Sequence, residues 1–120
     1  MSQRLLFPNE TKMRALSVRQ PHAEAILSGV KTIEYRSRAT NVRGRVYIYA
    51  AKGRYSAEQE AQFAQQYGMD DVESLDRGVL IGTVEISGCD GGEWQLASPQ
   101  RLETPIAPEK QPQPVWFKPF

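Results

Sequence analysis

The chain has 120 residues, 40% of them hydrophobic and 24% charged, with a formal net charge of +1. This length favours a single domain, and the composition is that of a globular protein rather than of a disordered chain. No apolar run approaches the roughly 20 residues that span a bilayer, and a lone cysteine (Cys89) and a lone histidine (His22) predict neither a disulfide nor a Cys/His zinc site.

The N-terminal part predicts a strand followed by a short helix. Residues 1–12 are polar and predict a flexible arm, and the largely apolar residues 13–18 predict a strand. Residues 20–29 predict the helix, because Pro21 fits a first helical position and Gly29 suits the left-handed residue that ends a helix.

Two further strands are predicted on either side of a loop. Residues 32–38 alternate in polarity, and we expect Ile33 and Tyr35 on the core face. Residues 45–51 are rich in β-formers, and the loop 40–44 that precedes them contains a glycine where strand pairing would begin.

The second half predicts a helix, a long strand and a tail. Ser56 and Gln59 form a capping-box pattern for a peripheral helix that ends near residue 68. Residues 78–86 predict a buried strand, which we expect the segment 88–92 to break.

Six of the eight prolines lie from Pro99 onward, so this tail is predicted to be extended, with Trp116 and Phe117 in a short edge strand. Five or six strands and two helices predict an α+β fold, either a curled sheet or a partial barrel. Residues 13–120 would form one domain with a proline-rich C-terminal segment. The short apolar run near the start and the single cysteine favour a cytoplasmic location.

The small net charge conceals a division between the two halves. Residues 1–54 carry eleven Lys/Arg against three Asp/Glu, a net of +8, whereas residues 55–120 carry four against eleven, a net of −7. This asymmetry suggests an anionic partner and a one-sided basic surface, unless the two halves mix on the folded surface.

The pattern Gly29-x-Lys31-x-x-Glu34-x-Arg36 is the densest functional signal in the chain. On a strand, residues 34 and 36 share a face, so Glu34 and Arg36 can either pair with each other or converge on one ligand. The competing interpretation is an exposed lysine beside a surface ion pair.

This motif, preceded by Leu16-Ser17-Val18-Arg19-Gln20-Pro21, resembles the ASCH domain, the activating signal cointegrator-1 homology domain. Two later stretches resemble strands of the same family: residues 43–52 and 78–84. The resemblance covers roughly residues 14–90 and the closing aromatic strand at 115–117.

The resemblance implies a PUA-like small β-barrel flanked by two helices, with RNA or a modified nucleoside bound in a cleft beside the first helix. Basic side chains suit the phosphate backbone, and aromatic side chains suit stacked bases. We therefore expect the following residues to contact nucleic acid: Arg19, Gln20, His22, Lys31, Glu34, Arg36, Arg38, Arg43, Arg45, Lys52 and Trp116.

An enzymatic alternative stays open, because the resemblance extends to some small bacterial relatives with this fold that are described as amidohydrolases of N4-acetylcytidine and use the equivalent lysine and a threonine. Lys31 matches the lysine, but Glu34 stands where the threonine is expected, and Thr32 lies two residues too early. Hydrolysis would then require Glu34 as general base and Lys31 as the oxyanion partner.

No metal and no cofactor are expected. The acidic residues between positions 70 and 76 match no metal-ligand spacing and predict a solvated loop, and no Gly-rich nucleotide loop is present. Cys89 is predicted to be a small packed residue at a strand end rather than a nucleophile.

Overall fold

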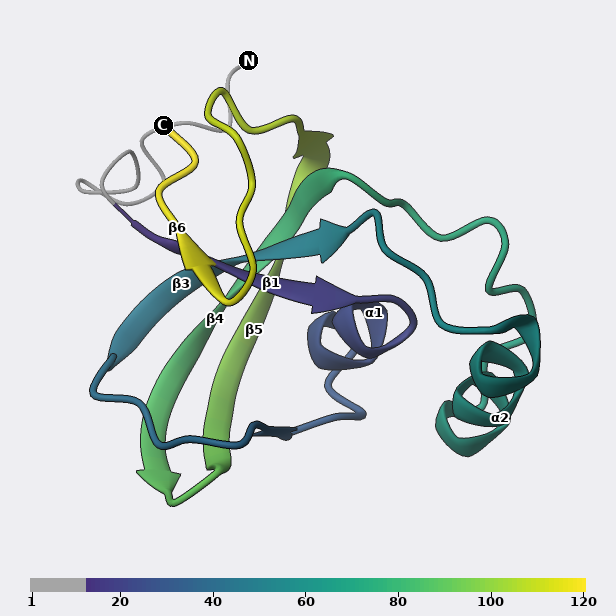
Figure 1. Cartoon of the computed structure of the whole chain (residues 1–120), viewed down its shortest axis with the longest axis horizontal. Helices are drawn as coiled ribbons and strands as arrows, with labels where there is room; N and C mark the ends of the chain where they lie inside the picture. The colour runs from purple at the N-terminus through teal and green to yellow at the C-terminus, as the bar shows by residue number, and fades with distance from the viewer. Residues whose placement is uncertain (1–12) are drawn as a thin grey trace.

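The computed structural model describes residues 13–120 as a strongly curled six-stranded sheet with two helices (Figure 1). The predicted N-terminal arm, residues 1–12, lies outside the described residues. The elements are β1 (Ala15–Arg19), α1 (His22–Leu27), β2 (Ile33–Tyr35), β3 (Gly44–Ala51), α2 (Ala57–Tyr67), β4 (Val79–Asp90), β5 (Glu93–Ile106) and β6 (Trp116–Phe117). The α+β small-barrel fold expected from the sequence is confirmed.

The strands follow the order β2-β5-β4-β3-β1-β6, so β2 and β6 form the two edges. β1 pairs in parallel with β3, and the other pairs are antiparallel. Register shifts interrupt the β3–β4 pair once and the β4–β5 pair three times. Each such irregularity bends and twists the strands locally, which curls the long β4–β5 ribbon over the rest of the sheet.

The principal core fills the space between the curled sheet and α1. Leu16, Ile26 and Ile48 are no more than 1% exposed and lie in this core. Gly82 lets α1 approach β4 closely, because a Cβ built on it would lie 2.2 Å from Leu27 Cδ1. A glycine in the middle of a buried strand is therefore explained by helix packing.

The helix α2 lies to one side of the sheet (Figure 1), at the periphery, as its thin apolar face predicts. The predicted capping box is confirmed. Ser56 Oγ accepts a hydrogen bond from the backbone N–H of Gln59, and Gln59 Oε1 accepts one from the backbone N–H of Ser56. Gly68 ends the helix in the left-handed conformation. Of the residues in the helix, only Glu60 and Ala64 are buried.

Two expectations from the sequence are wrong in detail, and one strand was not predicted. β4 continues through the predicted break and ends at Asp90, where Gly91 and Gly92 form the turn into β5. β5 is a 14-residue strand that the sequence pattern did not predict, and it includes the start of the tail that was expected to be extended. Tyr35 is 64% exposed rather than in the core, because β2 is a short edge strand that directs Glu34 inward.

Candidate functional site

A cavity of about 590 Å³ opens where β1 ends and α1 begins. Its walls come from the end of β1, from His22 of α1, from the segment 31–36 that contains β2, and from the segment that follows β3. Pro114 and Val115, next to the edge strand β6, close one side. We call this space the central cavity; its volume lies within the roughly 300–1,000 Å³ typical of ligand pockets.

The acidic residue of the central cavity is held between two cations. Arg36 Nε donates to Glu34 Oε2 at 2.5 Å, and Lys31 Nζ lies 3.5 Å from Glu34 Oε1. The Glu34 side chain is only 8% exposed, and Arg36 also donates through Nη2 to the carbonyl oxygen of Ser17. These contacts hold the side chains of Lys31 and Arg36 in defined positions at the wall of the cavity.

Aromatic rings lie against the cations of the central cavity. The guanidinium of Arg19 lies 5.1 Å from the ring centre of Tyr55, and the ammonium of Lys31 lies 5.0 Å from that of Tyr35. Contacts of this kind stabilise a cation near a surface by roughly 0.5–1 kcal/mol. The site therefore presents positive charge and π faces side by side.

His22 joins the central cavity to α2. Its ring packs against Tyr55 and Phe63, and its Nδ1 lies 2.7 Å from the hydroxyl of Tyr67. Burial, and secondly the charge of Lys31, lower the pKa of His22 from its ordinary value of 6.5. The imidazole is therefore neutral at neutral pH.

The charges that line the central cavity do not balance. Arg19, Lys31 and Arg36 contribute three positive charges, and Glu34 contributes the only negative one among the described lining residues. With His22 neutral, the lining carries a net charge of +2. A partly enclosed space of this charge favours an anionic ligand, because desolvation strengthens the electrostatic attraction.

Five of the residues predicted to contact nucleic acid line the central cavity together: Arg19, His22, Lys31, Glu34 and Arg36. Gln20 does not line it, because its side chain is 1% exposed and both ends of the amide are used. Gln20 Oε1 accepts from the amide of Glu24, and Nε2 donates to the carbonyl oxygen of Asp76. The prediction that Gln20 contacts the ligand is therefore corrected to a structural role beneath α1.

The other predicted contact residues lie elsewhere. Arg38 is exposed on the loop after β2, and Arg43 and Arg45 line a second cavity. Lys52 lies across Gly78, and Trp116 stacks on Trp94 with ring centres 5.8 Å apart. These residues therefore lie outside the central cavity, although the sequence predicts contacts with the same ligand.

Tyr55 and Ser17 also line the central cavity, although neither was predicted to contact the ligand. The available signal for Tyr55 was its position directly after the basic pair Lys52 and Arg54. Ser17 offered none, because its contribution to the geometry is a backbone carbonyl oxygen.

The charges of the two halves mix only in part. Arg54 pairs with Glu60 and Glu73, and Glu24 pairs with Arg101, so both contacts join the basic half to the acidic half. The expected one-sided basic surface is therefore interrupted near α2. The central cavity keeps its excess of cations from the first half.

The described residues contain neither a cluster of metal ligands nor a membrane-spanning helix. Within residues 13–120 no three His, Cys, Asp or Glu side chains gather in a way that could hold a metal ion. No helix in the same range is long and apolar enough to cross a membrane. Cys89 is partly buried and packs against the core, with Sγ 3.0 Å from the carbonyl oxygen of Gly91.

Comparison with known protein families gives one match. The family model of the ASCH domain matches residues 16–117, which is most of the chain and includes every residue that lines the central cavity. The ASCH domain is generally linked to RNA binding. No curated protein matches the chain.

Proposed function

The chain belongs to the ASCH domain family, and from this we propose that it binds RNA through the central cavity. The observation that carries the proposal is the net charge of +2 on a cavity that is built from ordered cations. RNA supplies the matching anion, because each nucleotide carries one phosphate.

Within the proposed complex, the cations bind phosphate and the rings bind bases. Arg19 and Lys31 line the cavity and already lie over tyrosine rings. A single-stranded nucleotide can therefore place its phosphate against these side chains and its base against Tyr35 or Tyr55. Stacking on an aromatic side chain contributes about 1–3 kcal/mol per base in proteins of this kind.

Glu34 is assigned the role of positioning the two cations. It contacts Arg36 through Oε2 and Lys31 through Oε1, so both of its oxygens are already occupied by cations of the protein. A ligand phosphate would meet Lys31 and Arg36 in fixed places, which reduces the side-chain entropy lost on binding.

The arrangement weighs against the amidohydrolase alternative. Arg36 Nε donates to one oxygen of Glu34 and Lys31 lies 3.5 Å from the other, so the carboxylate is already engaged by two cations of the protein. Thr32 is exposed and does not line the central cavity, so it does not supply the hydroxyl of the hydrolase pattern. Binding without turnover is therefore the function that we favour.

The proposal is tested by removing Lys31. We expect Lys31→Gln to weaken binding of a randomised single-stranded RNA pool about tenfold or more at low salt, because a charge-assisted phosphate contact is lost. Lys110→Gln is the matched control: it removes the same charge from an exposed residue outside the cavity lining and should change the affinity less than twofold. Fluorescence anisotropy measures both.

Equal effects of the two substitutions would show that attraction is diffuse, and would overturn the central cavity as the binding site. Thermal unfolding of Lys31→Gln verifies that the variant is folded. Incubation of the protein with N4-acetylcytidine tests the alternative: release of cytidine that disappears in Lys31→Gln would establish hydrolysis in place of simple binding.

A further inference from the structure

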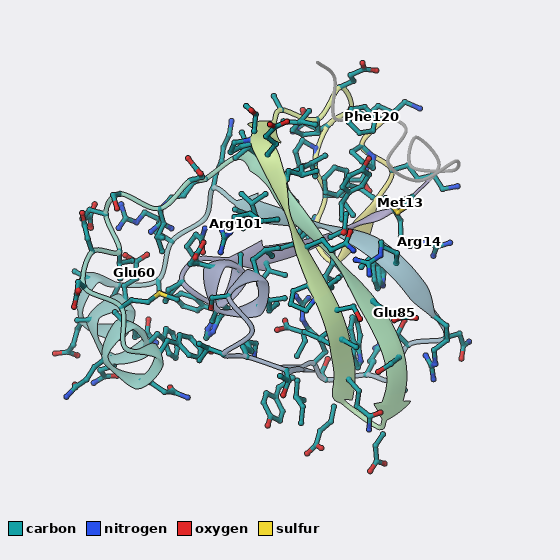
Figure 2. The ribbon with its side chains drawn as sticks, turned by 180° about the vertical axis from the view of Figure 1, so that it is seen from behind. Met13, Arg14, Glu60, Glu85, Arg101 and Phe120 are labelled. Atoms are coloured by element: carbon teal, nitrogen blue, oxygen red, sulfur yellow. The ribbon has the colours of Figure 1, made fainter. Side chains whose placement is uncertain are left out.

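A second cavity, of about 480 Å³, lies at the opposite end of β1 from the central cavity. It is lined by arginines at positions 14, 43 and 45 together with Asn41, and no carboxylate is among its described lining residues. We call it the arginine cavity. Figure 2 shows Arg14 on the far side of the molecule from α2, which carries Glu60.

Hydrogen bonds hold two of these arginines in place. Arg43 donates through Nη1 to the carbonyl oxygens of Thr40 and Val42, at 2.8 and 2.9 Å. Arg45 donates through Nη1 to Thr83 Oγ1 and to the carbonyl oxygen of Ser98. Because the hydrogen-bond partners of Arg43 within the described residues are neutral carbonyl oxygens, they do not cancel its positive charge.

One acidic residue lies nearby on β4. The sheet register places Glu85 opposite Arg45, and Glu85 is exposed. Arg14 and Arg43 are also exposed, and among the described residues the lining of the arginine cavity keeps a net positive charge even when Glu85 is counted.

A stack of four side chains connects the two cavities. Arg14 lies 5.9 Å over the ring of Trp116, the rings of Trp116 and Trp94 stack 5.8 Å apart at an angle of 5°, and Arg36 lies 5.6 Å over Trp94. Arg14 lines the arginine cavity and Arg36 lines the central cavity. The two cavities are therefore joined by a continuous row of packed side chains.

The loop after β2 runs between the two cavities over the same stack. It begins at Arg36 and reaches Asn41 and Arg43, and Trp94 Nε1 donates to the carbonyl oxygen of Arg38 at 2.8 Å. This bond ties the loop to the stack and leaves the Arg38 side chain exposed. Cations therefore follow one another from the central cavity to the arginine cavity.

We propose that the arginine cavity is a phosphate subsite for the same RNA strand whose nucleotide occupies the central cavity, an inference that rests on the proposed function. The three steps of 5.9, 5.8 and 5.6 Å separate the guanidinium carbons of Arg14 and Arg36 by no more than about 18 Å, which a stacked strand advancing about 3.4 Å per nucleotide covers in five or six nucleotides. Arginine forks match phosphate oxygens in geometry as well as in charge.

The length of the strand provides the test. A randomised RNA 12-mer is long enough for both cavities, whereas a nucleoside monophosphate occupies only one of them at a time. We expect Arg43→Gln to weaken the 12-mer three- to tenfold and to reduce the slope of log K against log salt by about 0.7, the value for one single-strand phosphate contact. The affinity of a nucleoside monophosphate for the central cavity, measured by NMR titration of its lining residues, should not change. Lys110→Gln again serves as the control for charge.

The outcomes separate the two proposals. Binding of the 12-mer that depends on Lys31 but keeps its salt slope in Arg43→Gln would overturn the phosphate subsite and leave the central cavity in place. An equal loss for both ligands would also overturn it, because the effect would then come from the central cavity. If the unaltered protein binds no 12-mer at low salt, both proposals fail.

Discussion

Two buried glutamates, Glu34 in the central cavity and Glu60 in α2, each lie between two cations, yet their surroundings differ in one respect. Their side chains are 8% and 4% exposed. Glu34 contacts Lys31 and Arg36. Glu60 contacts its own pair, Arg54 and Arg77.

The α2 cluster is balanced in charge. Glu73 also pairs with Arg54, so two carboxylates face two guanidinium groups. Hydrogen bonds from Arg54 lower the pKa of Glu60 and of Glu73, and the same bonds raise the pKa of Arg54. The charges of this cluster are satisfied by one another, which is the pattern of a structural ion-pair network.

The central cavity is not balanced, because Arg19 adds a third cation for which the lining offers no second carboxylate. Burial and pairing of a glutamate alone therefore do not distinguish a binding site from a structural network. An excess of positive charge beside an open cavity does distinguish them, because an added anion lowers the free energy there and not in a balanced ion-pair network.

The comparison predicts its largest effect for Glu60→Gln. This substitution leaves the Arg77 side chain, which is 14% exposed, without its carboxylate, and neither terminal nitrogen of Arg77 has a hydrogen-bond partner within the described residues. Breaking a buried pair in this way costs about 3 kcal/mol. We expect that loss in the free energy of unfolding, measured with urea, and no change in RNA affinity where the protein is folded.

Glu34→Gln is the corresponding substitution in the central cavity, and it tests whether the two glutamates differ in their contribution to stability. Lys31 and Arg36 line a cavity that water can enter, and Arg36 keeps its bond to the Ser17 carbonyl oxygen. Because Arg36 keeps this hydrogen bond, whereas Arg77 has no such partner within the described residues, we expect a smaller loss than for Glu60→Gln, about 1 kcal/mol. If the two substitutions destabilise the protein equally, the distinction between a balanced network and an open site is wrong.

Most elements could be predicted from the sequence because their signals are local. Ser56 and Gln59 predict the start of α2 through two hydrogen bonds within one turn. β5 could not be predicted in this way, since Pro99 and Pro105 lie inside it. Three register shifts in its pairing with β4 accommodate a strand whose own residues favour turns.

The sequence predicts which charged residues form the candidate site, but not which side of β2 faces the interior. Lys31, Glu34 and Arg36 were identified by their spacing, and the structure places all three in one cavity. The polarity of residues 32–38, however, predicts Tyr35 inside and Glu34 outside. The reverse is found because Lys31 and Arg36 neutralise the cost of turning a carboxylate inward, which a hydrophobic pattern does not include.

Ser56→Ala tests whether α2 and the central cavity are independent, because it destabilises α2 without changing any charge. Loss of the capping box should lower the free energy of unfolding by about 1 kcal/mol. Because Ser56 lies outside the lining of the central cavity, the RNA affinity should stay within twofold. A larger loss of affinity would mean that α2 is part of the binding site and that the two regions are coupled, with His22 as the point of contact.

The smallest expected effect is the pH dependence from His22, which touches both regions. Burial and Lys31 lower its pKa below 6.5, whereas Glu34 acts in the opposite direction and Arg36 adds to the lowering. As the pH falls through 6.5 the unfolded chain takes up this proton before the folded chain does, so the free energy of unfolding should decrease and level off below the folded pKa. His22→Gln should remove this part of the pH dependence.

RNA affinity should show the opposite trend over the same range. An anion in the central cavity favours the protonated imidazole, and by linkage protonation of His22 favours the anion. Stability should therefore fall while affinity rises as the pH is lowered, and both changes should vanish in His22→Gln. If RNA affinity falls together with stability, protonated His22 does not attract the ligand. The imidazole then has only a structural role in the packing against α2.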